Sequence, residues 1–192
     1  GGGTELTDYG RSVVATFRAL ERDYATMLDA LGARYPGIGP LAARTRAPRL
    51  RTSARNQWPG HVASIERHAP GALVAVDIGT DAPVLAALST AAVDELGLAP
   101  GAEVYALVKA TAVGVGVVAG WGSGPANRLH GTVAQLHVEP AGGRAELTLA
   151  LANARQVHAI VEATAIAALG VRIGIAAYAQ FEPAAVILAV GD

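Results

Sequence analysis

From Asn56 onward the sequence repeats itself, and this repeat limits the folds that the chain can adopt. Gly60-His61-Val62 matches Gly131-Thr132-Val133 at an offset of 71 residues, and Leu96-Gly97-Leu98 matches Leu169-Gly170-Val171 at an offset of 73. The change of offset predicts a small insertion between Pro140 and Gly143. Two copies of one short unit in tandem predict two similar structural modules that follow each other along the chain.

Each copy contains short apolar segments separated by turn residues, which is the pattern of β-strands. Strands are expected at Ala72–Ile78, Val84–Leu88, Val104–Val108 and Ala112–Val118, and in the second copy at Glu146–Leu151, Val157–Val161, Ile175–Ala179 and Ala185–Val190. One helical turn is expected per copy, at Thr90–Leu96 and at Thr164–Leu169. About five strands in roughly 65 residues is the size of a small Greek-key barrel of the OB type. The predicted fold is therefore mainly β, with tandem OB-like barrels at residues 51–121 and 122–192.

The front of the chain has a different pattern. Apolar residues at Val13, Phe17, Leu20, Tyr24, Met27 and Leu31 recur at alternating steps of four and three, with Thr7 as a helix N-cap and Gly32 as a stop. Two interpretations stay open: a helix that packs on its own domain, and a helix that pairs with its twin in a homodimer. The strict period of 3.5 favours a dimerisation helix within residues 1–32. Residues 33–50, rich in proline, glycine and arginine, are expected to form a linker.

Composition excludes several functions. Charged residues make up 16% of the 192 residues and the net charge is −1, which argues against binding nucleic acid through bulk charge. There is no cysteine, so thiolate metal sites are excluded and a cytoplasmic location fits. The most apolar window, from Val104 to Trp121, contains Lys109 and several glycines, so no membrane span and no membrane partner are expected. The five histidines have no zinc-like spacing, and no catalytic constellation stands out, so the chain is not expected to be an enzyme.

Two segments carry a resemblance to a known family. Thr52-Ser53-Ala54-Arg55-Asn56-Gln57 resembles the opening of the molybdate-binding Mop/TOBE module, and Leu96-Gly97-Leu98 with Lys109-Ala110 resembles its ending. The order of helix, opening segment and two Mop copies resembles the ModE family of molybdate-responsive transcriptional regulators. In that family a winged helix-turn-helix domain precedes this region and binds DNA; it is not in this sequence. The resemblance implies a homodimer that meets DNA only through that domain.

The same resemblance implies a site for molybdate, with tungstate as an analogue. Its ligand-binding residues would be Ser53, Arg55, Ser89, Lys109 and Ala110, the last through its backbone amide. Some relatives have a second hydroxyl where this chain has Ala92. In the second copy, Glu182 falls at the position of Lys109, and Gly124 and Ala126 fall at those of Ser53 and Arg55, so no equivalent site is expected there. Which subunit supplies which residue stays open.

These residue types suit a tetrahedral dianion that only accepts hydrogen bonds. Arginine offers a planar fork of N–H groups and lysine a compact charge, while serine hydroxyls and a backbone amide add directed donors. The oxyanion would be held by hydrogen bonds, with no protein atom bonded to the metal. Trp58 is expected to be a packing residue at the mouth of the first barrel.

Three other functions are compatible with parts of the pattern. A molbindin-type molybdate storage or buffering protein uses the same modules, but it needs neither the opening helix nor the arginine-rich linker. The regulatory TOBE tail of a molybdate transport ATPase is a second alternative, although the opening helix does not resemble that family. A nucleic-acid-binding OB protein would need exposed aromatic platforms, and only 5% of the residues are aromatic.

Overall fold

The computed structural model describes residues 50–117, 127–139 and 143–191, together with Thr7, Tyr9, Ser12, Thr16 and Met27. The chain divides into two units, Gly1–Arg49 and Leu50–Asp192. In the first unit Tyr9, Ser12, Thr16 and Met27 are helical. The rest of the expected dimerisation helix, almost all of the linker and the glycine-rich segment from Ala119 to Pro125 lie outside the described residues. Within the described part, no helix is long and apolar enough to cross a membrane.

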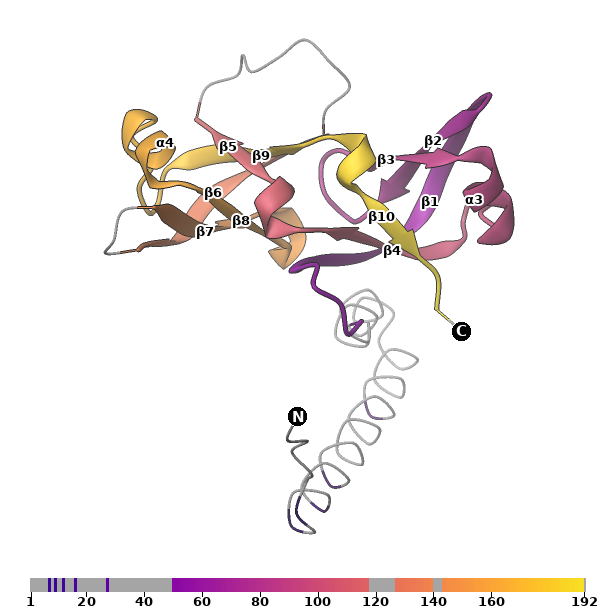
Figure 1. Ribbon diagram of the computed structural model, residues 1–192, viewed down its shortest axis with the longest axis horizontal. Helices are drawn as coiled ribbons and strands as arrows, with labels where there is room; N and C mark the ends of the chain where they lie inside the picture. Colours follow the sequence, from indigo (N-terminus) through magenta and orange to yellow (C-terminus); the bar gives the residue numbers. More distant parts are fainter. Residues whose placement is uncertain are drawn as a thin grey trace, which may run out of the picture. The chain divides into compact units, whose positions relative to one another are not determined.

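The second unit consists of the two sequence copies, which have the same order of elements (Figure 1). The first copy comprises β1 (Asn56–His68), β2 (Gly71–Asp77), β3 (Val84–Ser89), α3 (Thr90–Glu95), β4 (Glu103–Val108), η2 (Ala110–Ala112) and β5 (Gly114–Gly116). The second comprises β6 (Asn127–Val138), β7 (Arg144–Ala150), η3 (Ala152–Ala154), β8 (Gln156–Glu162), α4 (Ala163–Ala168), β9 (Ala176–Phe181), η4 (Pro183–Ala185) and β10 (Ile187–Ala189). The predicted tandem repeat of mainly β modules is confirmed, and η3 is an addition to the second copy.

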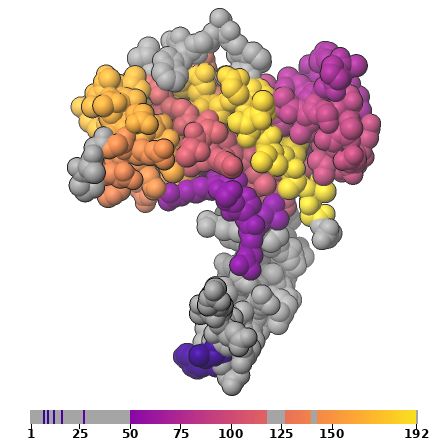
Figure 2. Space-filling model, in the orientation of Figure 1, coloured from indigo at the N-terminus to yellow at the C-terminus, as the bar shows by residue number. Residues whose placement is uncertain are grey.

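The two copies exchange their last strands. One sheet has the order β10-β4-β1-β2-β3, and the other has the order β5-β9-β6-β7-β8. Thus Ile187 of β10 pairs with Leu107 of β4, and Gly116 of β5 pairs with Tyr178 of β9, all antiparallel. Figure 2 shows the yellow C-terminal segment lying against the magenta first copy. The sequence does not predict this exchange, because a strand of three residues carries the same pattern whichever sheet receives it.

The two copies also share one hydrophobic core. A continuous cluster of buried residues runs from Val74, Val76 and Val84 in the first copy to Leu147, Leu149 and Val157 in the second. Trp58 of β1 stacks on Phe181 of β9, with ring centroids 5.8 Å apart. Separating the copies would expose this apolar surface and two sheet edges, so they form one folding unit.

The longest strands, β1 and β6, are missing from the sequence-based expectation. Polar and turn-forming residues at the start of each, including Pro59 and Gly60, hide the alternation that marks a strand. Pro59 is tolerated because this part of β1 pairs only with β4, and pairing with β2 begins at His61. A Cβ atom on Gly60 would overlap the carbonyl oxygen of Asp77, and one on Gly131 would overlap that of Ala150. Both copies therefore need glycine at this position.

Candidate functional site

Arg55 and Lys109 lie just beyond the paired ends of β1 and β4, at the same end of the first sheet. Asn56, the first residue of β1, pairs with Val108, the last residue of β4. Because the strands are antiparallel, the residues that flank this pair are Arg55 and Lys109, and both side chains are exposed. We call this end of the sheet, marked by Arg55 and Lys109, the cationic edge. The structure thus brings together two of the predicted site residues that lie far apart in the sequence.

The segment before Arg55 is fixed by local hydrogen bonds. The Gln57 amide nitrogen donates to the carbonyl oxygens of Leu50 (3.1 Å) and Ala54 (2.9 Å). The Ala54 amide donates to the Thr52 hydroxyl oxygen at 3.0 Å, and the Ala54 side chain is buried. Ser53, between them, is exposed at the cationic edge. The polar residues around Ser53 are therefore used to shape the segment.

Asn56 and Trp58 fasten the start of β1 to the second copy. The Asn56 side chain donates to the His158 carbonyl oxygen at 2.9 Å and accepts from the His158 amide at 2.7 Å. The Trp58 indole donates to the Gln156 carbonyl oxygen at 2.8 Å. Trp58 is thus a packing residue, as expected, but at the contact between the copies. Arg55 is consequently held beside the second copy, where its Nη1 lies 2.9 Å from Oε2 of Glu146.

Lys109 and Ala110 form the other side of the cationic edge. Lys109 is the N-cap of η2, and Ala110 is the first residue of that turn and is buried. The Lys109 carbonyl oxygen accepts from the Ala112 amide at 3.0 Å, which closes the turn. The first amides of a helical turn have no acceptor within the turn, so the turn itself does not use the Ala110 N–H that the resemblance assigns to the ligand. The side of η2 packs beside β8 of the second copy.

Ser89 lies at the other end of the same sheet. It ends β3 and pairs with Gly71, which in turn pairs with His68 at the far end of β1 from Asn56. Its hydroxyl oxygen caps α3 by accepting from the Ala92 amide at 3.1 Å, which leaves the hydroxyl hydrogen for another acceptor. Within one chain the structure therefore separates Ser89 from the cationic edge.

The second copy lacks every donor of the predicted site that can be compared. Superposing the order of elements places Glu162, the N-cap of α4, at the position of Ser89, and Glu182, the N-cap of η4, at that of Lys109. Pro183 takes the position of Ala110 and has no amide hydrogen. Gly124 and Ala126 lie outside the described residues. Sequence reasoning found Glu182 but missed Glu162 and Pro183, which repeat alignment alone could have found.

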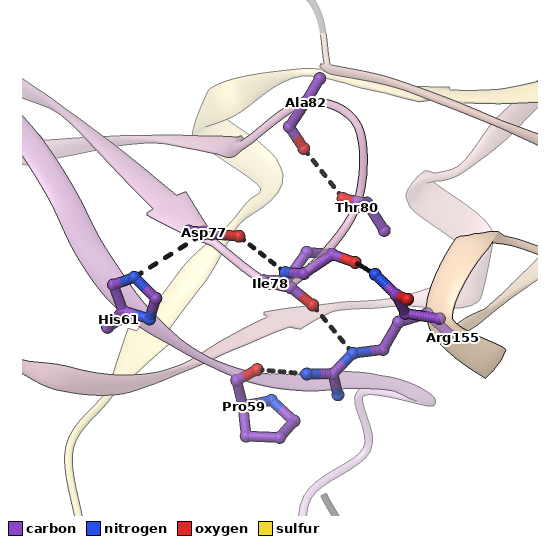
Figure 3. A network of polar contacts seen from close by, with 9 residues as sticks. Pro59, His61, Asp77, Ile78, Thr80, Ala82 and Arg155 are labelled. Carbon is purple, nitrogen blue, oxygen red and sulfur yellow. Dashed lines mark hydrogen bonds and ion pairs between the residues drawn. The ribbon is translucent and has the colours of Figure 1, made fainter. Parts of the chain in front are cut away.

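Arg155 is a further residue that sequence reasoning missed. Its guanidinium reaches from the second copy to the first, with Nε donating to the Ile78 carbonyl oxygen (2.8 Å) and Nη2 to that of Pro59 (2.9 Å) (Figure 3). Beside it, the Asn153 amide donates to the Gly79 carbonyl oxygen at 2.6 Å. Asn153 and Ala154 both have φ of 53°, a left-handed conformation that interrupts the regular turn of η3. No motif marks Arg155 in the sequence.

Metal-ligating groups do not gather in the part of the chain that the structure describes, where no three His, Cys, Asp or Glu side chains are placed to hold a metal ion. His61 lies 3.6 Å from Asp77, and His68 lies 3.8 Å from Glu66, both at exposed positions.

Several known proteins are similar to this chain in sequence. Residues 52–115 match the TOBE domain family. The molybdenum transport protein ModE of Azotobacter vinelandii is 38% identical over 195 residues, which cover 99% of this chain and 72% of that protein. The chain therefore belongs to the ModE/Mop family. The molybdenum-pterin-binding protein MopA of Rhodobacter capsulatus is 32% identical, and the match covers 98% of this chain and 71% of MopA.

A solved structure extends the ModE/Mop relationship to the fold. The cytoplasmic molybdate-binding protein ModG, in a form with molybdate bound, matches with a TM-score of 0.69 and 32% identity. The match covers 74% of this chain and all of the ModG chain. The tandem, OB-like modules of this ModE/Mop chain are thus an arrangement that recurs in the family.

Proposed function

We propose that this chain binds molybdate at the cationic edge and acts as the effector-sensing region of a molybdenum-dependent transcriptional regulator. The observation that carries the proposal is the juxtaposition of Arg55 and Lys109 at one end of the β1–β4 pair. Ser53 and the Ala110 amide flank these two charges. The names of the ModE, MopA and ModG relatives, which refer to molybdenum or molybdate, support the choice of ligand.

The donor set fits an oxyanion of double charge. Molybdate has four acceptor oxygens, and the cationic edge supplies two cations, a hydroxyl and a backbone amide. Hydrogen bonds to charged groups contribute about 1.5–3 kcal/mol each, so a few of them give sub-micromolar affinity after the cost of ordering. Sulfate has the same charge and shape, and discrimination against it would come from the size of the cage.

The position of Ser89 suggests that the complete site is shared by two chains. Ser89 and the cationic edge lie at opposite ends of one sheet. We therefore propose a homodimer in which Ser89 of one chain faces the cationic edge of the other, giving two identical sites. This fits the seam predicted for residues 1–32, and it makes ligand binding depend on the arrangement of the two chains.

Such a shared site links binding to regulation. A ligand that contacts both chains favours the arrangement in which the two half-sites meet. In a regulator, that arrangement would fix the spacing of the DNA-binding domains, and dimeric DNA-binding proteins recognise half-sites at a set spacing. The relatives in Yersinia pestis and Escherichia coli that are named transcriptional regulators support this role. A cytoplasmic location is consistent with it.

A storage or buffering protein is the second candidate, because the solved ModG chain is covered completely by the match and carries no further segment. The two roles differ in stoichiometry and assembly. A regulator of this kind is expected to be a dimer with one anion per chain. A storage protein is expected to form a larger oligomer with more anions per chain.

Calorimetric titration with molybdate tests the proposal. We expect tight binding of one anion per chain, with sulfate binding far more weakly. Arg55→Ala is expected to weaken binding by about 2 kcal/mol or more. Arg67→Ala is the matched control, because Arg67 is also an exposed arginine in an ion pair, with Asp94 at 2.8 Å. Absence of heat with millimolar molybdate would remove the ligand from the proposal, and equal losses in the two variants would remove Arg55 from the site.

A further inference from the structure

The guanidinium of Arg55 already has an anionic partner within the chain. Its Nη1 lies 2.9 Å from Oε2 of Glu146, which belongs to β7 of the second copy. The side chains of Arg55 and Glu146 are 51% and 47% exposed, so the pair is accessible to solvent and to small ions. One of the two cations of the proposed anion site is thus already paired with a carboxylate of the same chain.

The fold, and not chance proximity, sets this contact. Asn56 is fastened to the backbone of His158, and His158 pairs with Thr148 on the neighbouring strand β7. Glu146 lies two residues from Thr148 on the same strand, so both side chains are on the same face of the sheet. Arg55, next to Asn56, is therefore presented to that face.

The surroundings leave room for movement of the pair. Arg55, Glu146, Thr148 and His158 line a small cleft of about 100 Å³, and His137 of β6, which pairs with Glu146, lines it too. The Thr148 hydroxyl and Nδ1 of His158 are 3.1 Å apart and satisfy each other. Among the described residues, the carboxylate of Glu146 is thus held near Arg55 by an exposed ion pair.

We propose that Glu146 competes with the oxyanion for Arg55 and thereby sets the affinity of the site. The inference rests on the proposed function of the cationic edge. One guanidinium nitrogen cannot donate fully to the carboxylate and to the oxyanion at once, so the ligand must displace Glu146 or share its donor. The carboxylate also repels a dianion bound nearby, and both effects act in the same direction.

Displacement of an exposed ion pair by the ligand changes the affinity for that ligand only modestly. Exposed ion pairs contribute about 0.2–1 kcal/mol, which corresponds to a change in Kd of up to about fivefold. Glu146 would therefore adjust the concentration of molybdate at which the site fills, without preventing binding.

Titration of the full chain with molybdate tests the proposal in four variants: Glu146→Gln, Glu103→Gln, Arg55→Ala and the double variant of Arg55→Ala with Glu146→Gln. Glu146→Gln keeps the shape of the side chain and removes its charge, and we expect its Kd to be two- to fivefold lower than that of the unmodified chain. Glu103→Gln is the matched control, because it removes an exposed carboxylate from β4 that is not paired with Arg55. In the background of Arg55→Ala, the gain from Glu146→Gln should shrink to the part that comes from charge repulsion alone, and the difference between the two gains measures competition for Arg55.

The outcomes distinguish the two proposals. If the unmodified chain binds molybdate and Glu146→Gln equals Glu103→Gln, competition is excluded and the proposed function stands. If Glu146→Gln binds more weakly, Glu146 positions Arg55 and the proposal is wrong. If no variant binds molybdate, both proposals fall together. Melting temperatures of Glu146→Gln and Glu103→Gln within a few degrees of the unmodified chain confirm that folding is intact, as expected for half-exposed side chains.

Discussion

Asn56 and Asn127 make the same two hydrogen bonds to opposite copies of the repeat. The Asn56 side chain donates to the His158 carbonyl oxygen on β8 at 2.9 Å and accepts from the His158 amide at 2.7 Å. Asn127 does so with the backbone of Leu85 on β3, at 2.9 and 2.6 Å. The side chains are buried, with 1% and 3% of their surface exposed. Each asparagine side chain thus pairs with the edge strand of the other copy as a peptide group would, and the two contacts are reciprocal.

Alanine at either asparagine is expected to destabilise the chain by a similar amount. Each substitution removes the side-chain partner of one part-buried backbone N–H and one part-buried backbone C=O, at a cost of about 1–3 kcal/mol per group. Urea unfolding should therefore show losses of roughly 2–6 kcal/mol for Asn56→Ala and for Asn127→Ala. Asn153→Ala removes an amide that makes one exposed hydrogen bond, to Gly79, and is expected to cost less. A neutral Asn127→Ala would show that the two contacts are not equivalent.

The asparagine pair also shows what sequence reasoning could reach. The echo of Asn56 at Asn127 is visible in the repeat, and so are the positions of β3, β8, α3 and α4 to within one or two residues. Local patterns specify these elements because turns and apolar alternation are written within each segment. The partner of each asparagine cannot be read in this way, since it lies in the other copy, about a hundred residues away for Asn56.

In the candidate site, too, some features could be predicted from the sequence and others could not. Arg55 and Lys109 meet because an antiparallel pair of strands begins and ends there, which follows from a topology that the resemblance supplied. The separation of Ser89 from that edge and the contact of Arg55 with Glu146 depend on the long curved β1 and on the packing of the copies. Neither leaves a local signal, because Glu146 resembles any exposed strand carboxylate in the sequence.

Gly60 and Gly131 are expected to be irreplaceable for a steric reason that applies to both. A Cβ at either position would overlap a backbone carbonyl oxygen, of Asp77 or of Ala150, which cannot move without breaking its sheet. We expect Gly60→Ala and Gly131→Ala each to lower the free energy of unfolding by about 2–3 kcal/mol. Gly143→Ala is the control, since its Cβ would meet open space, and it should change stability by less than about 1 kcal/mol. Denaturant midpoints measure all three, and an unaffected Gly60→Ala would contradict the geometry of β1.

We expect the folded chain to lose stability at alkaline pH because of Tyr105. Burial raises the pKa of its phenol above the ordinary value near 10, and the carboxylate of Glu103 raises it further. The folded chain therefore holds this proton more tightly than the unfolded chain does. The resulting stability is fully present below pH ~10 and is lost as the pH rises through the folded-state pKa. Melting temperatures between pH 8 and 11 should fall less steeply in Tyr105→Phe.

Glu103→Gln provides the check on the cause. It removes the second contribution to the pKa of Tyr105 but leaves the first, so its alkaline profile should lie between those of the unmodified chain and Tyr105→Phe. Identical profiles for the unmodified chain and Tyr105→Phe would show that other groups control alkaline unfolding.

Mixing two inactive variants tests whether the site is shared between chains. In the proposed dimer, each site takes its cationic edge from one chain and Ser89 from the other. A dimer of one Arg55→Ala chain and one Ser89→Ala chain then has one site with both defects and one site that is intact. We expect each variant alone to bind molybdate weakly, and the refolded mixture to regain tight sites. With random pairing, half of the dimers are mixed and hold one intact site each, so about one quarter of the sites should be recovered.

The matched control replaces Ser89→Ala with Lys109→Ala. Arg55 and Lys109 lie on the same edge, so a mixed dimer of these two variants has one defect in each site and no intact site. Its titration should show only weak binding. If the Arg55 and Ser89 variants also fail to complement each other, although each folds and the mixed dimer forms, then Ser89 does not complete the site of a partner chain. The cationic edge would then hold the oxyanion with donors from a single chain, and the link between binding and dimer arrangement would lose its basis.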